Sequence, residues 1–147
     1  MSGIEVGYPV IDVQTTLVDA VFHETESSET AFKISGSMAF KNAALQAGPV
    51  LLEPVMICEI VTPDEYMGGV IGDLNGRRGK ILNIANRHGM QAIKAEVPLA
   101  TMFGYSTAVR SSSQGRATFT MEFSHYEPTP PNVANEIRTL AGVLPRN

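Results

Sequence analysis

The chain has little of several residue types, and each shortage excludes a class of site. It carries one cysteine, Cys58, among 147 residues, which excludes an intramolecular disulfide and a zinc site built from cysteines. No apolar run is long enough to span a bilayer, and the N-terminus lacks a signal-peptide pattern, so we expect a cytoplasmic protein without membrane contact. The Gly-x-x-x-x-Gly-Lys-Ser/Thr pattern is also missing, so the sequence predicts no phosphate-binding loop for a nucleotide.

Residue patterns that mark catalytic or metal sites are equally scarce. The three histidines, His23, His88 and His125, lie on separate predicted elements without metal-ligand spacing, which predicts no metal site. The serines, including the run 111–113, lack the glycine-flanked turn that presents a nucleophile. We therefore expect no catalysis and no cofactor within this chain.

The composition of the chain favours a folded protein, and its charges are unevenly distributed along the sequence. Hydrophobic residues make up 44% of the chain, enough for one domain or two small ones. The net charge is −4, but residues 1–76 carry −9 and residues 77–116 carry +6. A basic stretch within an acidic chain is typical of a local phosphate-facing surface; solvated basic loops are the alternative.

The first segment, residues 1–52, looks like an incomplete fold. Its pattern predicts a strand over Val10–Asp19, an acidic loop over 22–28 and a helix over Ser28–Ala47, capped by Ser27 or Ser28 and ended by Gly48-Pro49. The helix has one apolar stripe, formed by Ala31, Ile34, Met38 and Leu45. One strand and one helix cannot bury each other's apolar faces, so this segment should associate with something else.

The second segment, residues 53–128, looks complete. It begins with a strand near Val55–Val61 and a capping box at 62–65, in which Thr62 caps and Glu65 reaches back. The helix that follows has Met67, Val70, Ile71 and Leu74 on one face, and its glycines at 68, 69 and 72 are interpreted as allowing close helix–sheet packing. Strands over 80–86 and 91–97 are joined by a turn at 86–90.

An αβ unit over Pro98–Pro128 closes this segment. Its predicted helix buries Leu99, Met102, Phe103 and Val109, and its predicted strand alternates with Ala117, Phe119, Met121 and Phe123 on one face. The order βαββαβ predicts an α+β, ferredoxin-like split βαβ sandwich. After the prolines at 128–131, a last helix is predicted, capped by Asn132, with Val133, Ile137 and Leu140 on one face.

Four motifs in one order resemble the C-terminal part of translation elongation factor G. They are GYPVID at 7–12, PVLLEP at 49–54, IGDLNGRRG at 71–79 and PLATMFGYSTAVRSSSQGRATFTMEFSHYEP at 98–128. The resemblance implies that residues 1–52 are the second half of domain IV, a partial βα segment of a ribosomal protein S5 domain 2-like fold. It implies that residues 53–128 are the ferredoxin-like domain V and that 129–147 are a C-terminal helix and tail.

The resemblance also implies a function and its partners. The parent factor moves tRNA and mRNA through the ribosome at the expense of GTP, and this chain would contact RNA without hydrolysing GTP. The loop with His23, Glu24, Ser27 and Ser28 matches the tip that reaches the tRNA–mRNA duplex in the small-subunit decoding centre. Arg77, Arg78, Arg87 and His88 are candidates for contact with large-subunit ribosomal RNA near the stalk base. GTP and Mg²⁺ would belong to a G domain outside this chain.

Several alternatives remain open at this stage. His23 could be an ordinary solvated loop histidine, and Arg77 and Arg78 could merely offset a helix dipole. The chain could come from a ribosome-protection or recycling paralogue, or be a freestanding ferredoxin-like module that binds a ligand or partner. Met1-Ser2-Gly3 is typical of an artificial start and favours an excised fragment. Such a fragment should form a homodimer through residues 1–52, unless the terminal helix folds back over the exposed stripe.

Overall fold

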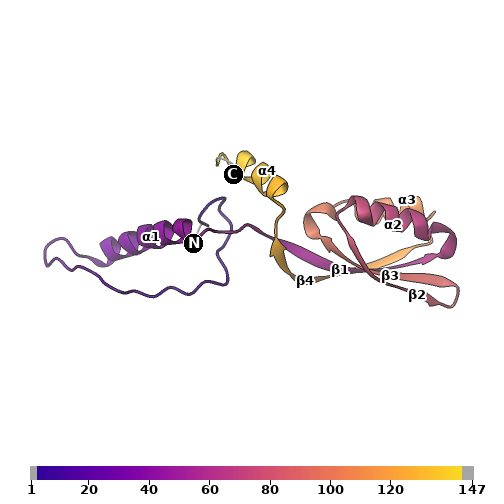
Figure 1. Ribbon diagram of the computed structural model, residues 1–147, viewed down its shortest axis with the longest axis horizontal. Coiled ribbons are helices and arrows are strands. Elements are labelled where there is room, and N and C mark those ends of the chain that lie inside the picture. The colour runs from indigo at the N-terminus through magenta and orange to yellow at the C-terminus, as the bar shows by residue number, and fades with distance from the viewer. Residues whose placement is uncertain (1–2, 144–147) are drawn as a thin grey trace. The chain divides into compact units, whose positions relative to one another are not determined.

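The computed structural model describes residues 3–143 and divides the chain into two compact units (Figure 1). One unit is the continuous stretch Leu52–Pro128. The other unit joins the residues up to Leu51 with those from Thr129 onward. Within the described residues, the hydrophobic core cluster lies entirely in the unit Leu52–Pro128.

The unit Leu52–Pro128 is a four-stranded antiparallel sheet with two α-helices. The strands run in the spatial order β2-β3-β1-β4, with β1 and β3 antiparallel and β4 pairing β1 on its other side. The elements are β1 (Leu52–Pro63), α2 (Met67–Gly76), β2 (Lys80–Arg87), β3 (Met90–Pro98), α3 (Tyr105–Ser112) and β4 (Thr118–Pro128). This βαββαβ order and strand arrangement confirm the predicted ferredoxin-like fold.

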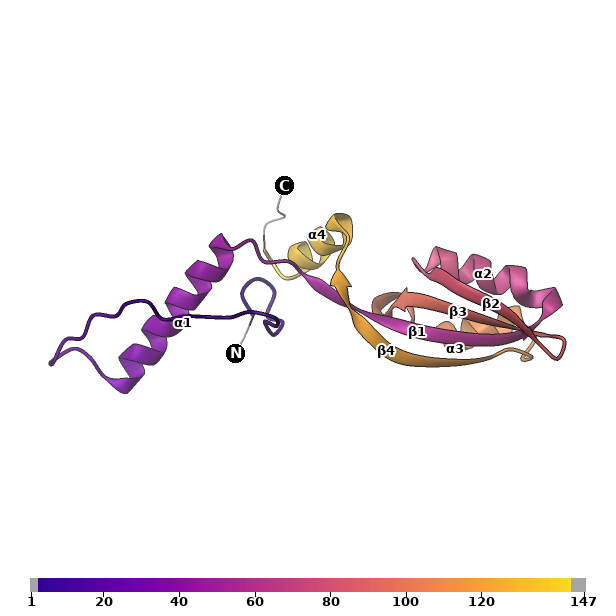
Figure 2. The ribbon, with the colours of Figure 1, turned by 60° about the horizontal axis from the view of Figure 1, so that its bottom comes forward.

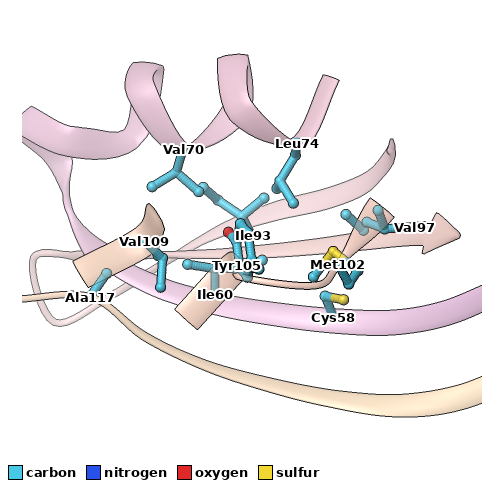
Figure 3. Packing of buried hydrophobic residues seen from close by; sticks show 11 residues of the cluster. Cys58, Ile60, Val70, Leu74, Ile93, Val97, Met102, Tyr105, Val109 and Ala117 are labelled. Atoms are coloured by element: carbon cyan, nitrogen blue, oxygen red, sulfur yellow. The ribbon is translucent and has the colours of Figure 1, made fainter. Parts of the chain in front are cut away.

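The core of this unit lies between the sheet and the two helices. Figure 1 shows α2 and α3 side by side over one face of the sheet. Figure 3 shows the buried side chains that lie between these helices and the sheet. The ring of Tyr105 meets Phe119 edge-on, with centroids 5.1 Å apart, a favoured aromatic geometry. The side chains of this cluster with no measurable exposure include Cys58, Ile60, Leu74, Ile93 and Val97.

The predicted capping box does not form. Thr62 continues β1 and pairs with Gln91 of β3, so its backbone belongs to the sheet. Its hydroxyl is buried without a hydrogen-bond partner, and a 3-10 helix, Asp64–Tyr66, begins two residues later without a side-chain cap. Strand pairing therefore overrides the local capping signal.

The interpretation of the helix glycines was also wrong. Gly68, Gly69 and Gly72 lie on the exposed side of α2, and a Cβ built on any of them would meet nothing within 4 Å. The buried face of α2 is carried instead by Val70 and Leu74. These glycines are therefore not required by packing against the sheet.

The helix predicted after Pro98 is interrupted. A 3-10 helix covers Leu99–Thr101, and Gly104, at φ 76°, precedes α3. This break turns Phe103 outward, where 78% of its surface is exposed, and places Tyr105 in the core in its stead. The spacing of apolar residues could not reveal this break, because Phe103 and Tyr105 are both aromatic and either could fill a core position.

The apolar face of β4 is only partly covered. Ala117 and Phe119 reach the core as predicted, but Met121 and Phe123 are exposed. The α-helix α3 has eight residues, or about 12 Å, whereas β4 has eleven, or about 36 Å. The helix is therefore too short to cover the whole strand.

In the first unit, the predicted helix forms and the predicted strand does not. The helix α1 spans Glu29–Gln46, and the Ser28 hydroxyl at its N-cap accepts a hydrogen bond from Ala31 N at 3.1 Å. Residues 13–20 have no strand pairing, because a strand needs a neighbour to bond. No residue of α1 is buried, so its apolar stripe stays uncovered and the expected homodimer stays a prediction.

The last helix, α4, spans Pro131–Leu140 and differs from the prediction in two ways. Pro131 occupies the first turn, so Asn132 is not the cap, and Leu140 is 89% exposed. The buried residues are Ala134 and Arg138, and Arg138 Nε lies 3.1 Å from Glu5 Oε2, with both side chains 9% exposed. The fold therefore ties α4 to the N-terminal segment through an ion pair.

Within residues 3–143, no helix is both long and apolar enough to cross a membrane.

Candidate nucleic-acid interface

The loop before α1, which matches the predicted tip, is closed by its own hydrogen bonds. His23 N donates to Ser27 Oγ at 2.8 Å, and Ser27 N donates to the His23 carbonyl at 2.8 Å. Beside this closed turn, the ring of Phe22 stacks on Phe32 of α1, with 6.1 Å between centroids and 8° between planes. These contacts give the loop a defined shape at the N-terminus of the helix.

The closed turn separates the four predicted tip residues into two roles. The hydroxyls of Ser27 and Ser28 are used by backbone amides of the turn and of α1. The side chains of His23 and Glu24 are exposed at the apex. His23 and Glu24 are thus the groups of this set that can meet a ligand, while the serines shape the loop.

Arg77 is held by the fold on three sides. Its Nε lies 3.0 Å from Asp73 Oδ2, its Nη1 donates to the carbonyl of Thr101, and its guanidinium sits 5.1 Å from the centroid of Tyr105. The Thr101 hydroxyl in turn donates to the Arg77 carbonyl at 2.7 Å. Arg77 therefore joins the C-terminus of α2 to the segment that precedes α3.

Arg78 is held even more directly. Its two terminal nitrogens bond the two carboxylate oxygens of Glu53, at 2.7 and 2.9 Å, which is the bidentate geometry that arginine favours. The hydrogen bond to Glu53 is the main cause that raises the pKa of Arg78. The Glu53 side chain is only 11% exposed, so the role of this ion pair is to stabilise the domain.

Arg87 and His88 lie in a more open setting. Arg87 Nη1 is 3.1 Å from Glu59 Oε1, and the side chain of Arg87 is 59% exposed while that of Glu59 is 38% exposed. His88 is exposed in the turn between β2 and β3, at φ 55°, beside Gly89 at φ 80°. Exposed ion pairs contribute little to stability, so Arg87 can exchange its partner at low cost.

The structure does not bring the four predicted residues of this second site together. Arg77 and Arg78 precede β2, whereas Arg87 ends it and His88 follows it. The two pairs lie at opposite ends of β2, whose eight residues span about 25 Å. The predicted site therefore divides into a half with partly buried ion pairs and an open half, in which the ion pair of Arg87 is exposed.

The open half gathers further basic groups at one end of the domain. This end, which we call the turn end, consists of the β2–β3 turn, residues 64–66 and the loop 113–117 (Figure 2). Bonds from Gln91 Nε2 to Asp64 Oδ1 at 3.0 Å and from Arg116 Nη1 to Glu65 Oε1 at 2.8 Å link its parts. Arg110, in the last turn of α3, is exposed there, and no ion pair is recorded for it within residues 3–143.

Sequence reasoning singled out neither Arg110 nor Arg116 as a site residue. Both belong to the basic stretch 77–116, where seven cations face one acid. Charge density alone cannot say which of these cations have internal partners. The available signal was the arginine in the last turn of a predicted helix before a Ser/Gly loop, a place where side chains stay exposed.

Comparison with known proteins shows two family matches and similarity to solved structures. Residues 50–137 match the model of the elongation factor G C-terminus, and residues 1–48 match that of elongation factor G, domain IV. A crystal structure of a protein from Thermus thermophilus matches with a TM-score of 0.85 and 37% sequence identity over 96% of this chain. The chain spans 21% of the length of that protein.

Proposed function

The chain belongs to the elongation factor G family and corresponds to its C-terminal part, and on that basis we propose that it contacts ribosome-bound RNA during GTP-driven translocation. The observation that carries the proposal is the match to both domain models in consecutive order along the chain. The role is mechanical and binding: the tip loop meets the tRNA–mRNA region, and the C-terminal domain meets large-subunit ribosomal RNA near the stalk base. GTP hydrolysis, with its Mg²⁺, belongs to the rest of the factor.

The geometry of the tip loop supports a contact by shape. His23 presents a planar ring that can stack on a base or form a hydrogen bond, and both contacts are typical of RNA recognition. Its neighbours Glu24, Glu26 and Glu29 are acidic and repel phosphates. The loop therefore approaches bases or sugars rather than the charged backbone.

The distribution of ion pairs supports the turn end as the phosphate-contacting part of the C-terminal domain. Arg77 and Arg78 are bound to Asp73 and Glu53, so contact with a phosphate would cost a partly buried ion pair. Contact between Arg110 and a phosphate has no such cost, because Arg110 is exposed and has no ion pair within the described residues. We accordingly place the RNA contact at Arg110, with Arg87, Arg116 and His88 around it.

Replacing Arg110 tests this placement. In a full-length factor that carries this sequence, Arg110→Ala should weaken ribosome association and lower the slope of log affinity against log salt by about one unit, because one phosphate contact is lost. The Arg110→Ala/Arg116→Ala double variant should lower it by about two. Lys80→Ala is the matched control, since Lys80 is exposed at the other end of β2. Unchanged slopes for both arginine variants would contradict the placement.

A further inference from the structure

A second group of polar side chains lies on the sheet face opposite α2 and α3. Glu96 of β3 and His125 and Glu127 of β4 each offer one ligand atom, and these atoms all lie within 4.8 Å of one another. Glu96 and His125 are half-buried, and Glu127 is exposed. The residues that flank Glu96, Ala95 and Val97, belong to the core, so alternation along β3 directs Glu96 to the other face.

A β-bulge brings His125 to the same face. Met56 of β1 pairs with Phe123, but Val55 pairs with His125, so Ser124 is an extra residue in β4. Without this residue, strict alternation from Phe119 would turn His125 toward the helices. Bulges commonly re-aim a side chain at functional sites. Glu127, two residues farther along β4, then shares the face of His125.

The imidazole is also held in a defined orientation. Ser124 Oγ lies 2.8 Å from His125 Nδ1, which points the other ring nitrogen, Nε2, at Glu127 Oε1 at 2.7 Å. A hydrogen bond to one ring nitrogen is the usual way in which proteins orient a metal-binding histidine. Ser124, the extra residue of the bulge, therefore has two effects. It rotates the following part of β4 so that His125 changes face, and its hydroxyl contacts the His125 ring.

We propose that Glu96, His125 and Glu127 bind a divalent transition-metal ion, with Zn²⁺ as the best fit. One imidazole nitrogen and two carboxylate oxygens are ligands that Zn²⁺ accepts, with a fourth position left for water. The imidazole disfavours Mg²⁺ and Ca²⁺, which prefer oxygen ligands throughout. The ion takes the place of the direct contact between Nε2 and Oε1, and it joins β3 to β4 across β1.

The neighbouring charges are compatible with a cation at this position. By register, Lys80 of β2 lies opposite Glu96, and Glu122 of β4 lies opposite Ile57, as does Glu96. Glu122 thus adds a third carboxylate beside the two of the site, while two ammonium groups border it, that of Lys80 and that of Lys94, which lies two residues before Glu96 on the same face of β3. The site lies within Leu52–Pro128, so it does not depend on the other unit of the chain.

Calorimetric titration of the 147-residue chain with ZnSO₄ tests the proposal. We expect saturation at one ion per chain with a dissociation constant in the micromolar range, and MgCl₂ should give no comparable isotherm. His125→Ala should abolish this binding, and Glu96→Gln should weaken it tenfold or more. Ser124→Ala should weaken binding about tenfold at unchanged stoichiometry, because it removes only the group that orients the ring.

Matched controls keep the outcome interpretable. His88→Ala removes an exposed histidine from the β2–β3 turn and should leave zinc binding unchanged. Circular dichroism of each variant verifies that it is folded, and zinc should raise the melting temperature of the wild type but not of folded His125→Ala. Absence of a saturable isotherm below millimolar zinc, or binding that persists in His125→Ala, would overturn the proposal.

Discussion

Arg78→Ala is expected to lower the free energy of unfolding of the chain by about 3 kcal/mol, since removing one partner leaves the other charge buried and unpaired. Glu53 would keep its carboxylate at 11% exposure without the two hydrogen bonds, at 2.7 and 2.9 Å, that now satisfy it. Arg78 itself is one third exposed, so the loss should lie at the lower end of the range for buried ion pairs.

Urea denaturation followed by circular dichroism measures this loss. The matched control is Arg87→Ala, which breaks the exposed pair with Glu59 and should cost less than about 1 kcal/mol. In a Glu53→Gln background, Arg78→Ala should cost much less than in the wild type, since no charge is left unpaired. Equal losses for Arg78→Ala and Arg87→Ala would contradict a structural role for Arg78.

His23→Ala is expected to slow single-round translocation by a full-length factor about tenfold, because a lost stacking or hydrogen-bond contact with RNA is worth about 1–3 kcal/mol. GTP hydrolysis should stay within about twofold of wild type, which corresponds to less than about 0.5 kcal/mol, because we place the nucleotide site outside this chain. Stopped-flow measurement of mRNA movement, with phosphate release recorded in parallel, separates the two steps.

Two further variants identify the kind of contact. Thr25→Ala changes an exposed residue of the same loop without removing a ring and should translocate like wild type. His23→Phe keeps a planar ring and should restore most of the rate if the contact is stacking, whereas His23→Gln should do so if it is a hydrogen bond. Wild-type kinetics for His23→Ala would remove this residue from the mechanism.

The order of elements in the C-terminal domain could be predicted because local patterns and tertiary structure agree there. Residues 117 and 119 alternate as a strand and do pack into the core, and Val70 and Leu74 face the sheet from α2. The first unit behaves differently. Residues 10–19 have a strand pattern, but hydrogen-bonding partners decide whether a strand forms, and none pairs with residues 13–20 in the structure.

The candidate sites were less predictable, because their properties depend on contacts between residues far apart in the chain. Arg78 and Glu53 are 25 residues apart, so no local pattern could show that this arginine is paired. Likewise, His125 meets Glu96 only because one extra residue in β4 shifts the register. The alternation of apolar and polar residues in β4 ends at Ser124, so the sequence pattern does not indicate a bulge at this residue.

The central claim of the proposed function is that RNA is contacted by the exposed side chains Arg110 and His23. Directed hydroxyl-radical probing of ribosome complexes tests this, with an iron chelate attached to Arg110→Cys, His23→Cys or, as control, Lys80→Cys in a full-length factor. Within this chain, Cys58 will not take the label, because it is buried and burial raises the pKa of its thiol to about 11.

We expect position 110 to cleave large-subunit ribosomal RNA and position 23 to cleave small-subunit ribosomal RNA near the mRNA, with much weaker cleavage from position 80. Cleavage from position 80 that equals or exceeds that from position 110, or no ribosomal RNA cleavage from positions 110 and 23, would contradict this assignment of the contacts.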